Sequence, residues 1–132
     1  MPHFIVEYTS NIAAGADIGS LLRKASATLA SQDGVFPLGG IRSRALQYND
    51  YCVADGSADR GYVHATLKIG FGRTPAAKQR VCKELFEMLQ EHFGPARSPQ
   101  PPLLSMELYE FDEGGTYRLN NLHSRFRRPG PK

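Results

Sequence analysis

Two segments of the chain alternate apolar and polar residues, which is typical of β-strands that bury one face. The first covers residues 3–8, and the second covers residues 62–69, where one face carries Val63, Ala65, Leu67 and Ile69. Further strands are predicted over residues 41–48 and 103–111. Residues 49–61 are expected to form a loop or a short hairpin.

Apolar residues at helical spacing separate the two strands of each pair. A first helix is predicted over residues 18–31, with Asp17 as its N-cap. A second has Thr74 as its N-cap and Pro75 in the first helical position, where a missing N–H costs nothing, and it ends at a Gly-Pro pair. Its predicted buried stripe comprises Val81, Leu85, Met88, Leu89 and either His92 or Phe93.

The order of these elements predicts an α/β two-layer fold built from two duplicated βαβ units, at about residues 2–48 and 62–111. A crossover helix of this length joins parallel strands with a right-handed connection, so both helices should cover one face of a four-stranded sheet. We expect a single domain over residues 1–126 and a basic flexible tail over residues 127–132.

The other face of the predicted sheet is left uncovered, and its mixed character suits either solvent or a subunit interface. On the last two strands it presents His64, Thr66, Lys68, Ser105, Glu107 and Tyr109. A chain of 132 residues with 41% hydrophobic residues forms a modest core, which oligomerisation often completes.

The positive charge of the chain is concentrated at its end. The formal charge is +3, but residues 116–132 hold five basic residues and no acid, which leaves 11 basic and 13 acidic residues elsewhere. The predicted domain therefore lacks the basic stripe that tracks phosphates, which argues against nucleic-acid binding. No apolar run approaches a membrane span and no secretory signal opens the chain, so we expect a cytoplasmic protein without a membrane partner.

The cysteines and histidines show no metal or disulfide pattern. Cys52 and Cys82 lie far apart and form neither a CxxC pair nor a disulfide framework, which fits a reducing compartment. Cys82 is expected to be a small buried thiol within a helix. The histidines lack the spacing of a metal site, so no metal is expected; they are His3, His64, His92 and His123.

The start of the chain carries a distinctive chemical signal. If Met1 is removed, Pro2 becomes a secondary amine at the end of a rigid strand. An amine in an apolar pocket near cations has its charged form disfavoured, so its pKa falls and it can be neutral near pH 7. Pro2 is then a candidate general base, although a lone proline here is also common by chance.

Several segments occur together in an order that resembles a known family. The proline after the initiator Met, the duplicated βαβ units, the Gly-Ile-Arg-Ser-Arg strand and the Leu-Lys-Ile-Gly-Phe-Gly-Arg turn resemble the tautomerase superfamily. More narrowly, residues 2–7, 36–38, 40–44 and 63–73 together with the Asn120-Asn121 pair resemble the 5-carboxymethyl-2-hydroxymuconate isomerases. The resemblance spans nearly the whole chain, and its specificity lies in the order and spacing of the motifs.

The resemblance implies a homotrimeric, cofactor-free isomerase of bacterial homoprotocatechuate breakdown, with the amino-terminal proline as base. Its substrate would be an unsaturated di- or tricarboxylate, a 2-hydroxymuconate-type dienol that becomes the conjugated 2-oxo acid. Such a reaction passes through a dienolate, so it needs a base and fixed cations. We therefore expect Pro2, Arg42 and Arg73 to be catalytic.

The arginines suit this chemistry because a guanidinium binds carboxylate with a planar fork and stays charged. Arg73 lies where a Gly-rich turn enters a helix, so helix-start N–H groups can add to its attraction for an anion. Arg42 and Arg44 are two apart in a strand and point to the same face. On the residues alone, each arginine is more often a solvated surface charge.

Further substrate contacts are expected from Arg44, Phe36, Phe71, Asn120 and Asn121. The two phenylalanines can line the pocket or belong to the core, and the asparagine pair can close over a neighbour's site or form a turn. Two alternatives stay open: another proline-dependent tautomerase, hydratase or dehalogenase on a different unsaturated acid, and a non-catalytic ligand-binding trimer.

Overall fold

Four strands form one sheet in the order β2-β1-β3-β4. They are β1 (His3–Thr9), β2 (Arg42–Tyr48), β3 (Tyr62–Gly70) and β4 (Leu103–Phe111). β1 is parallel to β2 and β3 is parallel to β4, whereas the two central strands, β1 and β3, are antiparallel. The structure is a computed structural model that describes residues 1–95, 97 and 100–126; the tail predicted at residues 127–132 lies outside them.

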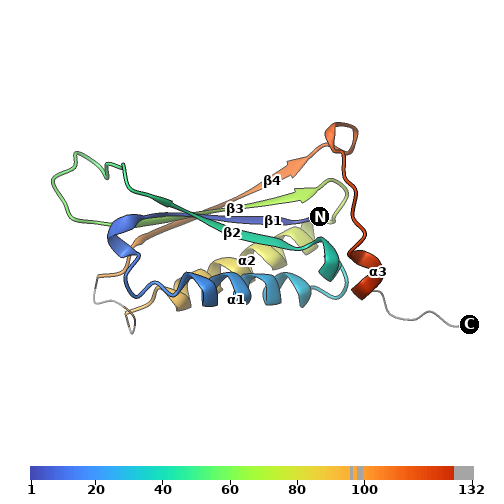
Figure 1. Cartoon of the computed structure of the whole chain (residues 1–132), viewed down its shortest axis with the longest axis horizontal. Coiled ribbons are helices and arrows are strands. Elements are labelled where there is room, and N and C mark those ends of the chain that lie inside the picture. Colours follow the sequence, from blue (N-terminus) through green and yellow to red (C-terminus); the bar gives the residue numbers. More distant parts are fainter. Residues whose placement is uncertain (96, 98–99, 127–132) are drawn as a thin grey trace, which may run out of the picture.

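Two long helices, α1 (Ile18–Ala30) and α2 (Pro75–His92), form the second layer, on one side of the sheet (Figure 1). Each helix connects two parallel strands, which confirms the predicted βαβ units and the α/β two-layer fold. The predicted N-caps are also confirmed, because the side chain of Asp17 accepts a hydrogen bond from the Ser20 N–H and that of Thr74 accepts one from the Ala77 N–H.

Short helical turns complete the described part of the chain. They are η1 (Ser10–Ile12), η2 (Leu38–Gly40), η3 (Glu113–Gly115) and α3 (His123–Phe126). Each has only three or four residues, too few to show a hydrophobic period in the sequence. Among the described residues, no helix combines the length and the hydropathy needed to cross a membrane.

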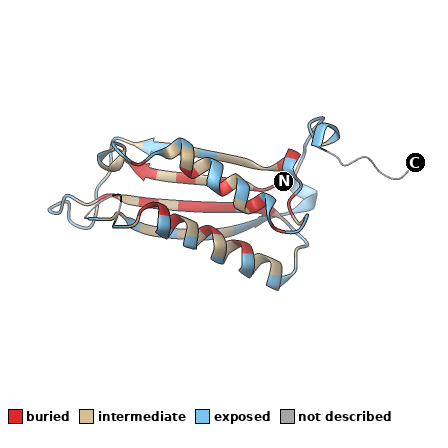
Figure 2. Cartoon of the chain, turned by 90° about the horizontal axis from the view of Figure 1, so that it is seen from below, coloured by how far each residue is buried: buried red, intermediate tan, exposed pale blue. Residues whose placement is uncertain are grey.

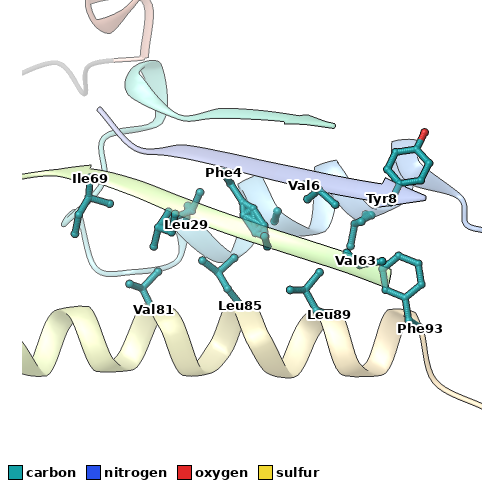
Figure 3. Packing of buried hydrophobic residues seen from close by; sticks show 14 of the residues in the cluster. Phe4, Val6, Tyr8, Leu29, Val63, Ile69, Val81, Leu85, Leu89 and Phe93 are labelled. Carbon is teal, nitrogen blue, oxygen red and sulfur yellow. The ribbon is translucent and has the colours of Figure 1, made fainter. Parts of the chain in front are cut away.

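The core fills the space between the sheet and the helices. Figure 2 shows buried residues along one side of each helix and on the central strands, and Figure 3 shows how they meet. The side chains of Phe4 and Val6 on β1 point into the core layer that also contains Leu85 of α2. The predicted stripe of α2 is confirmed for its buried members Val81, Leu85, Leu89, His92 and Phe93, while Met88 is partly buried.

The opposite sheet face is uncovered in the single chain, and the strand register arranges its residues in rows. One row contains Arg42 of β2, His3 of β1, Lys68 of β3 and Tyr109 of β4. Further along the strands, the phenol of Tyr48 donates to Glu7 at 2.8 Å. This face is therefore mixed, with charged groups beside exposed Leu46 and Tyr109, as the sequence predicts.

The core position of Leu85 leads to a test of this packing. Leu85 is fully buried, so Leu85→Ala should lower the free energy of unfolding by about 2–5 kcal/mol, through lost burial and the cavity left behind. Leu119 is 100% exposed, and Leu119→Ala should change it by less than about 0.5 kcal/mol. Urea unfolding at one fixed protein concentration measures both values, and equal values would contradict the packing described.

Candidate functional site

Pro2 lies at the start of β1, where the chain is fixed by its neighbours. Its carbonyl accepts a hydrogen bond from the backbone N–H of Arg42 at 3.0 Å, and its side chain is fully buried. β1 pairs with β2 on one side and with β3 on the other. The start of the chain is therefore held at the end of a central strand, as a rigidly placed amine requires.

Two glycines of η2 form a close wall beside the start of the chain. A Cβ on Gly40 would lie 3.6 Å from the Cα of Met1 and 3.3 Å from the Cε1 of His123. A Cβ on Gly39 would lie only 3.0 Å from the backbone of His123. The pair therefore lets α3 approach the start of β1, which a larger residue would prevent.

The side chain of Arg42 folds back over the glycines of η2. Its Nη1 donates to the carbonyls of Gly39 at 3.0 Å and Ile41 at 2.9 Å. The side chain of Asn120 donates to the same Gly39 carbonyl at 3.0 Å. Arg42 and Asn120, which lie far apart in the sequence, therefore meet at one carbonyl near Pro2.

Arg73 is held between two loops. Its Nη1 donates to the Gly70 carbonyl at 3.1 Å and its Nη2 to the Val35 carbonyl at 3.3 Å. The guanidinium carbon lies 4.9 Å from the centre of the Phe36 ring, in the range of a cation–π contact. Phe36 is itself buried in the core. This residue, which was predicted to line the pocket or to belong to the core, therefore packs against the guanidinium of Arg73 from the core side.

The charges gathered here act on the chain terminus. The pKa of the Met1 amine is lowered from its ordinary value, first by burial and then by the positive charges of Arg73, Arg118 and Arg42. The pKa of Arg73 is lowered in turn by burial and by Arg118. This end of the sheet therefore favours a neutral amine surrounded by guanidinium groups.

Arg44 lies on the uncovered sheet face and contacts His3 rather than the wall of glycines. Its Nη1 is 3.0 Å from the Nδ1 of His3. Burial lowers the pKa of His3, and the charges of Arg44, the chain terminus, Arg42 and Lys68 lower it further. A neutral imidazole can then accept the hydrogen bond from Arg44.

Two shallow hollows flank the start of the chain. One, of about 360 Å³, is lined by His3, Arg44, Lys68, Phe111, Gly115, Thr116 and Tyr117. The other, of about 410 Å³, is lined by Pro37, Leu38, Gly39, His123 and Phe126. The segment after β4 supplies part of each wall, so it shapes the site on both sides.

The remaining predicted residues are placed less centrally in the single chain. Phe71 is 71% exposed in the turn after β3, outside the core cluster. Asn121 offers its backbone carbonyl to the hydroxyl of Ser124, which is a turn contact. Arg118 and His123 were not predicted as site residues, because the segment that carries them has no strand or helix period to place it.

A cavity of about 330 Å³ lies at the other end of the sheet, beside Asn11, Gly61 and Phe93. β1 ends there and β3 begins there, so the length of a seven-residue strand, about 20 Å, separates it from Pro2. It is therefore distinct from the site described. Among the described residues, no three His, Cys, Asp or Glu side chains are grouped to hold a metal ion.

Comparison with known proteins gives the family. The profile of the 5-carboxymethyl-2-hydroxymuconate isomerase family matches residues 2–126. The chain is 41% identical over 127 residues to the 5-carboxymethyl-2-hydroxymuconate Delta-isomerase of Escherichia coli, which covers 96% of this chain and all of that protein. The crystal structure of a 5-carboxymethyl-2-hydroxymuconate isomerase from Deinococcus radiodurans R1 is 38% identical, with a TM-score of 0.90 over 96% of this chain and 95% of that one.

A more distant solved structure shares the fold alone. It is a fused 4-OT, described as a symmetric trimer, with 14% identity and a TM-score of 0.67 over 92% of this chain and 98% of that one. The family profile and the two closer proteins match nearly the whole chain, including every element that surrounds Pro2. The chain therefore belongs to the 5-carboxymethyl-2-hydroxymuconate isomerase family, whose characterised relative in Escherichia coli is an isomerase.

Proposed function

We propose that this protein converts 5-carboxymethyl-2-hydroxymuconate, or a closely related dienol, to the conjugated 2-oxo acid, with Pro2 as the base once Met1 is removed. The observation that carries the proposal is a buried Pro2 at the end of a central strand. Burial and then the charges of Arg73, Arg118 and Arg42 lower the pKa of the Met1 amine next to it. The substrate is inferred from the relatives in Escherichia coli and Deinococcus radiodurans R1, which are named as isomerases of 5-carboxymethyl-2-hydroxymuconate. We place the reaction in cytoplasmic breakdown of aromatic compounds.

The proton balance of this reaction needs a single base. The neutral amine of Pro2 takes the proton of the 2-hydroxyl group and leaves a dienolate, and the resulting ammonium delivers a proton to C5. The 2-oxo group and the shifted double bond are then in place, and the amine is neutral again. The same burial and arginine charges that lower the pKa of the Met1 amine should lower that of the Pro2 amine once Met1 is removed. A lowered pKa suits both steps, because it keeps the amine neutral and makes its conjugate acid a ready proton donor.

Arg42 and Arg73 are proposed to bind the carboxylate and 2-oxo ends of the dienolate. Each gives two hydrogen bonds to backbone carbonyls, which fix its orientation. A guanidinium has five N–H donors, so donors remain for a substrate carboxylate. Cations already in position stabilise developing negative charge without reorganising during the reaction.

We further propose that the protein is a homotrimer whose subunits meet on part of the uncovered sheet face, leaving the hollow beside His3 open to a ligand. The mixed face, on which Leu46 and Tyr109 are exposed among polar residues, can serve as a subunit interface. The hollows beside Pro2 are shallow in the single chain, so a neighbouring subunit can enclose the substrate. A structure with this fold is a symmetric trimer.

The role of Pro2 leads to the first functional prediction. A peptide nitrogen cannot act as a base, so the active protein should lack Met1, and intact-mass measurement should show its loss. Pro2→Ala leaves a more flexible primary amine, and its kcat on the dienol should fall by about 10²-fold or more while circular dichroism stays unchanged. Full activity in a preparation that keeps Met1 would disprove the proline mechanism.

The charge of Arg73 should affect both the rate and its pH dependence. Arg73→Ala should lower kcat/KM by the equivalent of about 2–4 kcal/mol, as for the loss of one oxyanion donor, and Arg42→Ala should be comparable. The base must be neutral, so kcat/KM rises as pH passes upward through its depressed pKa. Removal of the Arg73 charge raises that pKa, so the rising limb should move to higher pH.

Two further variants serve as comparisons for Arg73. Arg73→Lys keeps the positive charge but loses the planar guanidinium that can bind a carboxylate through two N–H groups. Its kcat/KM should therefore fall, while the pH dependence of kcat/KM stays near that of the parent protein. Arg23 lies exposed on α1, and Arg23→Ala should change neither quantity. If Arg73→Ala and Arg23→Ala behave alike, Arg73 has no part in the reaction.

The assembly can be tested independently of catalysis. Sedimentation at micromolar concentration should give a trimer, because the uncovered sheet face needs a partner. Glu7 lies on this face, and Glu7→Arg should shift the population toward smaller species through repulsion between like charges on one surface. A monomer with full activity would rule out the trimer and the shared site.

A further inference from the structure

A positively charged row crosses the uncovered sheet face at the end where Pro2 lies. The register places Arg42, His3 and Lys68 side by side on β2, β1 and β3. Arg44 lies two residues further along β2, with its Nη1 3.0 Å from the Nδ1 of His3. Arg42 turns away to the carbonyls of Gly39 and Ile41, so Arg44 and Lys68 are the cations of this row that remain on the face.

Neither of these two cations has a carboxylate partner among the described residues. The lysines Lys78 and Lys83 form ion pairs, whereas Arg44 contacts His3, and the ammonium of Lys68 lies 5.7 Å from the centre of the Tyr109 ring. The acids of this face lie further along the strands. Glu7 accepts from Tyr48, and Glu107 lies 3.3 Å from His64. An unneutralised positive region is thus left beside the chain terminus.

This region has a hollow of suitable size. The hollow of about 360 Å³ is lined by His3, Arg44 and Lys68, together with Phe111 and residues 115–117. Consecutive Cα atoms are about 3.8 Å apart and paired strands about 5 Å apart, so the backbone of Lys68 lies within about 10 Å of Pro2. The two residues are therefore close enough for one ligand to extend from Pro2 toward the side of the sheet that carries Lys68.

We propose that Lys68 and Arg44 form a second carboxylate subsite, which selects dienols with three carboxylates over those with two. This inference rests on the proposed function. Muconate carries two carboxylates, and the 5-carboxymethyl group adds a third. Arg42 and Arg73 match the two ends of the dienolate, which leaves the carboxymethyl arm to a further cation. Lys68 and Arg44, which line the hollow, supply that positive charge. His3 is a positioning residue that holds Arg44 by accepting its hydrogen bond.

The test compares two substrates that differ by one carboxylate. Lys68→Met should lower kcat/KM about tenfold for 5-carboxymethyl-2-hydroxymuconate and less than twofold for 2-hydroxymuconate. Lys68→Arg should restore most of the loss. Lys83 is exposed on α2, far from the hollow, and Lys83→Met is the matched control that should leave both values unchanged.

The outcomes separate the subsite from the reaction itself. If the parent protein isomerises both dienols and Lys68→Met loses equally on each, the subsite is wrong and the proposed function stands. If Lys68→Met also sediments differently from the parent protein, Lys68 belongs to a subunit contact, which likewise overturns the subsite. Inactivity of the parent protein on both dienols overturns the proposed function.

Calorimetry tests the subsite without any turnover. Propane-1,2,3-tricarboxylate and pentanedioate share a five-carbon frame with two end carboxylates and differ by one central carboxylate. The parent protein should bind the triacid about tenfold more tightly, and Lys68→Met should reduce that ratio to about two or less, while Lys83→Met keeps it. A ratio that Lys68→Met leaves unchanged, or no binding of the triacid to the parent protein, overturns the subsite.

Discussion

The double pairing of β1 is the constraint on which the site depends. A chain terminus is ordinarily the least ordered part of a domain. Here the strand that follows Pro2 is bonded to β2 and β3 along its length, and the Pro2 carbonyl receives the first bond of the β2 ladder. The first nitrogen of the processed chain would therefore stay within a narrow region, and the two glycines of η2 let the opposing wall approach it.

Around this fixed point, local turns rather than ion pairs hold the cations. Arg42 and Arg73 donate to backbone carbonyls, so their positive charge is oriented without being neutralised. A carboxylate partner would have fixed the arginines equally well but would have raised the pKa of the nearby amine. Carbonyl bonds thus keep both properties that the proposed dienolate chemistry requires, a weakly basic amine and guanidinium groups whose charge is not neutralised.

The sequence predicted the elements well, because strands of period two and helices with proline and glycine boundaries are local signals. Both N-caps, the stripe of α2 and the bounds of β4 are confirmed. The segment after β4 could not be placed in this way. Asn120 meets Gly39 across 81 residues, and Arg118 and His123 come with it. Such contacts arise only once the sheet has brought both ends of the chain together.

The different environments of Arg42 and Arg44 show how a correct rule can still leave a site unresolved. The alternation of side chains along a strand puts both arginines on the uncovered face. The strand register agrees, because it pairs them with His3 and Ile5 of β1. Arg42, however, is the first residue of β2, so no strand residue before it blocks its side chain from folding back across η2. Arg44 has strand on both sides and stays on the face beside His3. The start of β2 therefore separates two arginines of one face: Arg42 donates to the carbonyls of Gly39 and Ile41, whereas Arg44 lines the hollow beside His3.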